Sequence, residues 1–292
     1  MILLLVTFLC LVVIVIAEDK QIVGVASIAG ILAGFLVEKV FKSFQDCTDI
    51  TNWQQSLRSI WRNGDLKKHD LIRISFAYLF RIRIGDKYLL VRNNRGTQKF
   101  QPVGGAYKFN EDEKLYLEDK FYINSDSCIK IDNISKNDYR LKIRSRDLKK
   151  FVRRFNRTTQ REMLDDLSRE VKEELISTGI LNFRKIKYKY CGRHFTKVEY
   201  SKYFKCYELL MADIVELILD SEQEEALNSL LYLNSDKYIF ADSDDVKACG
   251  VELGTDELLE DIADHSYKIL QETGPELLHG KYYAKIYDVD LT

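Results

Sequence analysis

The stretch LSREVKEELISTG, residues 167–179, carries the pattern that decides the fold. Upstream of it, Thr159 and Glu162 have the spacing of a capping box, which predicts that a helix begins near Gln160. At about 100° per residue, one stripe of this helix is apolar and contains Leu164, Leu167, Val171 and Leu175. We therefore expect an amphipathic helix that packs against a core.

A second stripe of the same helix is acidic and contains Asp166, Glu170, Glu173 and Glu174. Carboxylates at this spacing repel each other by roughly a few tenths of a kcal/mol per pair, so a merely solvated face gains nothing from the arrangement. A divalent cation would reverse the sign, because Mg²⁺ takes carboxylate oxygens together with substrate phosphates. The pattern leaves both interpretations open: an ordinary solvated face or a divalent-metal site.

The composition is that of a globular chain with a substantial core. Of 292 residues, 46% are hydrophobic and 30% charged, and the formal net charge is −1. The near-zero charge argues against a protein that coats nucleic acid, and we expect no duplex nucleic acid as a partner. The six cysteines show no paired spacing, so the sequence predicts no disulfide scaffold.

Two apolar runs, residues 1–17 and 21–37, stand before the rest of the chain, separated by Glu18, Asp19 and Lys20. Each run has about the minimum length for a helix that crosses a bilayer. We predict a two-helix transmembrane hairpin over residues 1–41. The alternative, a secretory signal, lacks the basic leader of such signals and is followed at once by a second apolar run.

Basic residues after the second run, such as Lys39 and Lys42, favour the cytoplasmic side. The prediction is therefore a multi-pass protein of the inner (cell) membrane, in contact with the lipid bilayer, whose soluble domain is cytoplasmic. Ala26, Gly30 and Gly34 recur every four residues and predict close helix approach, within the hairpin or in a homo-oligomer.

Residues 42–69 are interpreted as a juxtamembrane linker with a short amphipathic helix. Its apolar face contains Trp53, Leu57, Ile60 and Trp61, and Gly64 ends it. The tryptophans would lie at headgroup depth or pack on the following domain, and the sequence leaves this open.

Residues 70–292 alternate between strand and helix patterns, which predicts one mixed α+β domain. Residues 71–93 are rich in β-branched and aromatic residues, and Gly85 and Asp86 supply a hairpin turn. Gly104 and Gly105 follow; a glycine pair lets the backbone take positive φ or approach a ligand closely, so both are candidate nucleotide-binding residues.

The segment at about residues 107–157 begins acidic and ends strongly basic. Its basic end is either a solvated face or a surface that binds phosphate, and we favour an anion-binding role. Arginine suits bidentate phosphate contacts. The candidate nucleotide-binding arginines are Arg144, Arg146, Arg153 and Arg154.

The order of a strand pair, Pro102-Val103-Gly104-Gly105 and a helix bearing Arg169-Glu170-Val171-Lys172-Glu173-Glu174 resembles the Nudix hydrolase superfamily. The resemblance spans roughly residues 71–269 and implies a Nudix-like α/β/α sandwich with a mixed sheet, interrupted by the basic insert. This sequence departs from the family signature in three places. About fifty residues separate Gly105 from the helix, where the family has a short loop. Arg161 stands where the upstream Glu belongs, and the closing glycine, expected at position 176, is displaced to Gly179.

By this resemblance, Glu170, Glu173 and Glu174 are the implied ligands of Mg²⁺ or Mn²⁺, and Arg169 would orient their carboxylates. The same four residues are the candidate catalytic group, and one carboxylate or a side chain outside this block would activate water. The implied reaction is hydrolysis of the diphosphate bond in a nucleoside diphosphate that is linked to a second group.

A membrane hairpin before such a domain looks like the transmembrane-Nudix effectors encoded beside CD-NTases in the bacterial anti-phage systems called CBASS. This layout implies a cyclic oligonucleotide messenger as ligand, a functional link to a CD-NTase and action at the membrane that halts growth. Two hypotheses follow: a non-catalytic sensor that assembles when the messenger binds, or an active membrane-tethered pyrophosphohydrolase.

Overall fold

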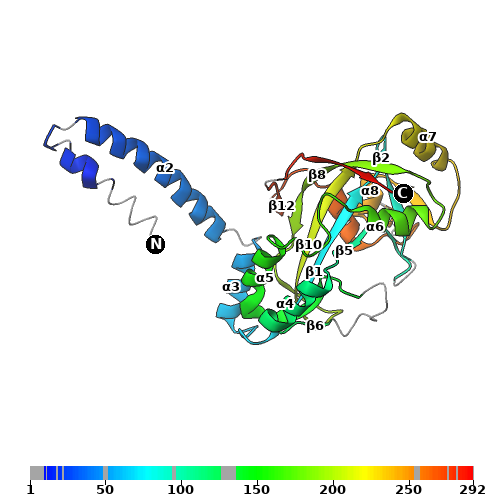
Figure 1. The fold of residues 1–292 in the computed structure, drawn as a ribbon, viewed down its shortest axis with the longest axis horizontal. Coiled ribbons are helices and arrows are strands. Elements are labelled where there is room, and N and C mark those ends of the chain that lie inside the picture. Colours follow the sequence, from blue (N-terminus) through cyan, green and yellow to red (C-terminus); the bar gives the residue numbers. More distant parts are fainter. Residues whose placement is uncertain are drawn as a thin grey trace.

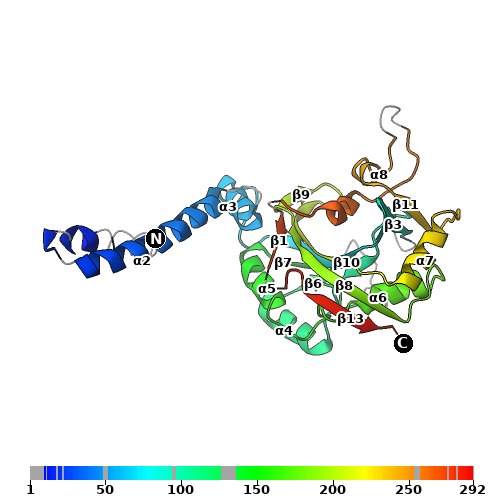
Figure 2. The same ribbon diagram turned by 90° about the horizontal axis from the view of Figure 1, so that it is seen from above.

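The computed structural model of the chain describes residues 10, 12–17, 19–21, 23–48, 52–93, 97–125, 136–252, 257–274, 276–280 and 282–291. A mixed sheet forms the centre of the domain, and helices cover it (Figures 1 and 2). The strands are β1 (Leu71–Arg81), β2 (Arg83–Ile84), β3 (Lys87–Arg92), β4 (Phe100–Gln101), β5 (Gly104–Ala106), β6 (Asn124–Ser125), β7 (Arg140–Arg144), β8 (Lys185–Phe195), β9 (Glu199–Ser201), β10 (Cys206–Leu217), β11 (Tyr238–Ala241), β12 (Leu277–Leu278) and β13 (Ile286–Asp290). The helices are α2 (Val23–Thr48), α3 (Trp53–Asn63), α4 (Glu111–Phe121), η1 (Ser145–Asp147), α5 (Leu148–Phe155), α6 (Ser168–Val171), η2 (Lys172–Ile176), α7 (Ser221–Leu230), α8 (Ser243–Lys247) and η3 (Asp264–Leu270).

Strand β1 is the middle of the larger sheet. It pairs in parallel with β10 on one side and antiparallel with β7 and β5 on the other. Alternate β1 residues such as Phe76, Tyr78 and Phe80 are fully buried on one face. The opposite face carries the small residues Ser75 and Ala77, which leave room above the sheet. The predicted mixed α+β fold is confirmed.

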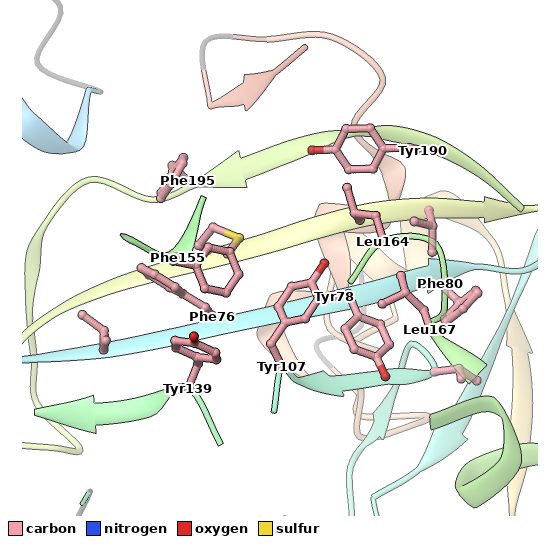
Figure 3. Close-up of a cluster of buried hydrophobic side chains, with 14 of the residues drawn as sticks. Phe76, Tyr78, Phe80, Tyr107, Tyr139, Phe155, Leu164, Leu167, Tyr190 and Phe195 are labelled. Atoms are coloured by element: carbon pink, nitrogen blue, oxygen red, sulfur yellow. The ribbon is translucent and has the colours of Figure 1, made fainter. Parts of the chain in front are cut away.

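The main core is unusually aromatic. Figure 3 shows Phe76, Tyr139 and Phe155 gathered on one face of the sheet. The Phe155 ring centroid lies 4.9 Å from that of Phe76 and 4.9 Å from that of Tyr139, both edge to face. Such pairs contribute about 0.5–1.5 kcal/mol each beyond the area they bury.

The described parts of the predicted insert at residues 107–157, which are residues 107–125 and 136–157, are built into this core. Its strand β7 lies next to β1 in the main sheet, and its helix α5 buries Phe151 and Phe155 against the same face. The described parts of the segment between the glycine pair and the acidic helix therefore belong to the folded domain.

The amphipathic helix α3 packs against the domain. Trp53 and Leu57 are buried in the main core, and the Trp61 Nε1–H donates to the Ser145 hydroxyl at 3.0 Å. The Val198 N–H donates to the Ser56 hydroxyl at 2.8 Å. Of the two placements that the sequence left open for the tryptophans, the structure shows the one on the domain.

Replacing Trp61 by Phe should lower the free energy of unfolding by about 1 kcal/mol, because one hydrogen bond between α3 and the buried Ser145 is lost while an aromatic ring is kept. Urea denaturation measures this change. The Arg58→Gln variant on the exposed face of α3 is the control and should change stability by less than about 0.5 kcal/mol. Equal stability of the Trp61 variant and the unmodified chain would contradict the docking of α3.

The predicted two-helix transmembrane hairpin is wrong for the described part of the chain, because none of its helices is long and apolar enough to cross a membrane. Much of the first apolar run lies outside the described residues. The second run is not a separate span; from Val23 on it forms the first part of α2, which extends past the run to Thr48. The predicted multi-pass location in the inner membrane rested on this hairpin and is corrected with it.

Candidate functional site

The acidic helix begins later than its sequence predicts. It starts at Ser168, whose N–H donates to Asp166 Oδ1 at 3.1 Å, and not near Gln160. The predicted capping box is wrong because Glu162 is engaged elsewhere: its Oε2 accepts the Lys108 N–H at 2.9 Å and its carboxylate binds Arg169. The apolar stripe is nevertheless buried as expected, with Leu164, Leu167, Val171 and Leu175 all in the main core.

From Lys172 to Ile176 the helix widens into a π-helical turn, η2, which carries Glu173 and Glu174. Glu170 lies in the preceding turn, α6. π-Helical turns occur preferentially at functional sites because they redirect side chains within a helix. The three predicted ligands are therefore presented from one short segment.

The glycine pair lies directly against these carboxylates. The Gly104 N–H donates to Glu174 Oε2 at 2.9 Å. A Cβ atom at Gly105 would lie 1.9 Å from Glu170 Oε1, and one at Gly104 would lie 2.2 Å from the Tyr78 carbonyl oxygen. Glycine at position 105 therefore allows β5 to approach the acidic helix this closely, and glycine at position 104 allows it to pack against the backbone of β1.

Arg169 is the centre of the polar network behind the carboxylates. It donates to both oxygens of Glu162, at 2.5 and 3.1 Å, to the Ala106 carbonyl at 2.8 Å and to Glu170. Its Nη1 lies 3.7 Å from Glu173 Oε1. Burial would lower the pKa of Arg169, but hydrogen bonding to Glu162 and the charge of Glu170 raise it above its ordinary value, so the guanidinium stays charged.

Glu162 is a site residue that sequence reasoning assigned to a helix cap. The family signature places a Glu at position 161, and this chain has Arg161 there. The irregular segment before α6 absorbs the one-residue displacement, so Glu162 still reaches Arg169. The sequence signal that could have identified Glu162 as a site residue was its position next to Arg161, where the signature expects a Glu.

A cavity of about 420 Å³ lies between the carboxylates and the open face of β1. Glu170, Glu173 and Glu174 line it together with Gly104 and Gly105. Four basic side chains also line it, and the neutral polar side chains of the lining come from His265 and four further residues. The basic residues are Arg92, Arg140, Lys237 and Lys268, and the further neutral ones are Ser75, Asn93, Gln101 and Thr178. The cavity thus has the mixed charge needed to hold a cation and a polyanion together.

The donor set fits a divalent cation in its chemistry, because three carboxylates on one wall supply the hard oxygen ligands that Mg²⁺ and Mn²⁺ prefer. As the side chains stand, no three acidic, His or Cys groups in the described ranges are gathered tightly enough to hold an ion. Glu170 is drawn to Arg169 and Glu174 to the Gly104 N–H. The Glu173 side chain is 32% exposed.

The predicted nucleotide-binding arginines lie elsewhere. Arg144 donates to Asp147 at 2.9 Å, and Arg154 donates to the buried Glu113 at 2.5 and 3.0 Å. The four arginines are on β7, η1 and α5, and both views place α5 toward the end of the domain nearer α2 while α6 lies toward the other end (Figures 1 and 2). The structure does not bring them into the carboxylate cavity, and anion binding by them stays a prediction.

A mixed sheet, a glycine pair and a helix bearing Arg-Glu-x-x-Glu-Glu around one cavity define a domain of the Nudix class. The family model described as the SMODS-associated NUDIX domain matches residues 71–270, and the chain belongs to this family. Membership of the Nudix superfamily, predicted from the motif, is confirmed. The family name points to CBASS-type effectors and to a CD-NTase as functional partner.

Among solved structures, the chain is similar to a NUDIX hydrolase from Nitrosomonas europaea, with 13% identity over 60% of this chain and 76% of that chain and a TM-score of 0.25. No curated protein matches the chain.

The two glycines should respond differently to substitution by alanine. In Gly105→Ala the new Cβ meets the flexible end of Glu170, so we expect a displaced carboxylate, weaker divalent-metal binding and little change in melting temperature. In Gly104→Ala the new Cβ meets backbone at a φ of +152°, so we expect a loss of more than about 1 kcal/mol of stability. Calorimetric Mn²⁺ titration measures the loss of metal binding, and urea denaturation measures the loss of stability. Identical metal affinity and stability in the two variants would contradict both expectations.

Proposed function

We propose that this domain hydrolyses a nucleoside diphosphate-linked substrate in a reaction that depends on Mg²⁺ or Mn²⁺. The observation that carries the proposal is the shared cavity: Glu170, Glu173 and Glu174 line it, and so do four basic side chains. A polyanion bound near three carboxylates requires a cation between them, and a diphosphate supplies the remaining ligands of that cation.

In this proposal Glu170, Glu173 and Glu174 would hold the cation, and the chemistry it would supply is a lowered pKa of a water molecule and neutralised charge on the diphosphate. Arg169 positions Glu170 and is itself fixed by Glu162 and the Ala106 carbonyl. Gly104 and Gly105 keep β5 close enough that its backbone borders the cavity. The small side chains of Ser75 and Ala77 leave space for the substrate above β1.

The test is a panel of nucleoside diphosphate-linked compounds, such as ADP-ribose, UDP-glucose and NADH, incubated with the purified chain and Mg²⁺ or Mn²⁺. Chromatography of the products should show a nucleoside monophosphate that disappears when EDTA is added. Absence of any metal-dependent product across the panel, from a chain that melts cooperatively, would count against hydrolysis.

The second candidate is a non-catalytic CBASS sensor that takes a cyclic oligonucleotide in the same cavity. Two observations favour it: the family name, and the engagement of Glu170 by Arg169 and of Glu174 by the Gly104 N–H. Cyclic di- and trinucleotides would then bind without being cleaved and drive self-association. Analytical ultracentrifugation with and without these nucleotides tests this, and a monomer at every nucleotide concentration would remove the sensor hypothesis.

A further inference from the structure

Two side chains that line the cavity come from η3, a helix that is distant in sequence from the acidic helix. The short 3₁₀ helix η3 packs on β1 and β10, where Ile269 joins Leu79 and Ile214 in the second core cluster. From this helix Lys268 and His265 line the same cavity as Glu170, Glu173 and Glu174. Lys268 is only 5% exposed.

The other cationic side chains of the cavity already have partners. Arg140 donates to Asp138, Lys237 donates to the Thr178 carbonyl at 2.9 Å, and Arg92 donates to the Asp236 carbonyl at 2.5 Å. Within the described part of the chain, the Lys268 side chain makes no hydrogen bond and no ion pair within 4.0 Å, and Glu276, Glu208 and Glu199 act on it only through longer-range electrostatic attraction. A buried ammonium without a partner costs stability, so its presence requires a compensating role.

Lys268 nevertheless carries its charge. Burial lowers its pKa to about 8, while the more distant Glu276, Glu208 and Glu199 raise it. At neutral pH the ammonium is therefore largely protonated. Its neighbour His265 is neutral at that pH, because burial and Lys268 lower its pKa to about 4, so the imidazole adds hydrogen-bonding capacity without a second charge.

We propose that Lys268 is the anion-binding residue of the cavity, which takes a phosphate group of a nucleotide whose other phosphate faces the carboxylate wall. The inference deepens the proposed function and rests on it for the class of ligand. A diphosphate has two charged groups, and the cavity offers one buried ammonium and, through its carboxylates, one cation site. Ser75, Ala77 and Ala212 are the small residues that leave room along the cavity.

The test compares Lys268→Met with the unmodified chain in calorimetric titrations with ADP and with inorganic pyrophosphate, each with and without Mg²⁺. Met keeps the length and apolar stem of Lys and removes the charge. We expect at least about tenfold weaker binding of both probes and unchanged binding of adenosine, which has no phosphate. The matched control is Lys247→Met on α8, whose side chain is 62% exposed and pairs with Asp244; it should bind ADP normally.

If Lys268 had a purely structural role, Lys268→Met would lower the melting temperature. Because Met removes an unpartnered buried charge, the variant should melt at the same or a higher temperature than the unmodified chain while it loses affinity. Equal ADP and pyrophosphate affinities in the variant and the unmodified chain would overturn the proposal, as would the absence of saturable binding of either probe to the unmodified chain. Lys268-dependent binding without any cleavage would overturn hydrolysis alone and leave the anion site standing.

Discussion

The Glu173→Gln and Glu174→Gln variants should each lose metal-dependent cleavage by about 100-fold or more. Glutamine preserves the size of each side chain but removes the negative charge that a divalent cation requires. In Glu174→Gln the side-chain amide oxygen can still accept the Gly104 N–H, so the contact at 2.9 Å and the local fold should survive. Initial rates at saturating Mg²⁺, measured by chromatography, give the size of the loss.

Glu225→Gln is the matched control, because Glu225 is exposed on α7 and lies outside the cavity. It should cleave at the unmodified rate. Melting temperatures of all three variants should agree within a few degrees, since the Glu173 side chain is partly exposed and the side chain at position 174 keeps its hydrogen bond. Full activity in both Glu173→Gln and Glu174→Gln would exclude the acidic turn as the reaction centre.

Local sequence patterns placed together the parts of the candidate site that are close in sequence, although only the resemblance to the Nudix signature favoured the glutamates as metal ligands. Helical periodicity indicated that Glu170, Glu173 and Glu174 share one face, and the structure places all three on one cavity. The glycine pair was equally visible, because two adjacent glycines after a strand pattern have few structural explanations. The closeness of Gly105 to Glu170, however, required the strand register Tyr78↔Gly105, which no local pattern contains.

Residues brought in from a distance were missed for the same physical reason. Lys268 follows Gly105 by more than half the chain, and its helix η3 has seven residues, too few for a recognisable amphipathic period. His265 has no ligand or triad partner among its sequence neighbours, so its local pattern indicates only a structural role. Only the packing of η3 on β1 and β10 places both beside the carboxylates.

The apolar segments at the beginning of the chain misled in a different way. Hydropathy reports the tendency of a run to leave water, but it does not report where a helix ends. Residues 21–37 read as a complete span, whereas α2 runs on to Thr48. The amphipathicity of α3 was correctly predicted. The sequence could not show whether its apolar face meets lipid headgroups or the domain, and only the packed structure shows the contacts with Ser145 and Val198.

Asp213→Ala should lower the free energy of unfolding by about 3–5 kcal/mol, because it leaves the Arg193 guanidinium, whose side chain is only 15% exposed, without its counter-charge. Asp213 is fully buried in β10 and accepts four hydrogen bonds: from Tyr107 at 2.7 Å, from Tyr190 at 2.8 Å, and from Arg193 at 2.8 and 2.7 Å. Tyr107 directly follows β5, so this network also anchors the strand that carries the glycine pair. Urea denaturation at neutral pH measures the loss, and Asp288→Ala on the exposed face of β13 should change stability by less than about 0.5 kcal/mol.

The pH dependence of the same variant separates charge from packing. Burial alone would raise the pKa of Asp213, but Arg193 and the two tyrosine hydroxyls hold it below the ordinary value of an aspartate. The stabilisation by this carboxylate is therefore complete above that ordinary value and is lost as the pH falls through the lowered pKa. The stability difference between Asp213→Ala and the unmodified chain should accordingly shrink in strong acid. A difference below about 1 kcal/mol at neutral pH, or one that is unchanged in acid, would mean that the ion pair does not hold β10, β8 and the end of β5 together.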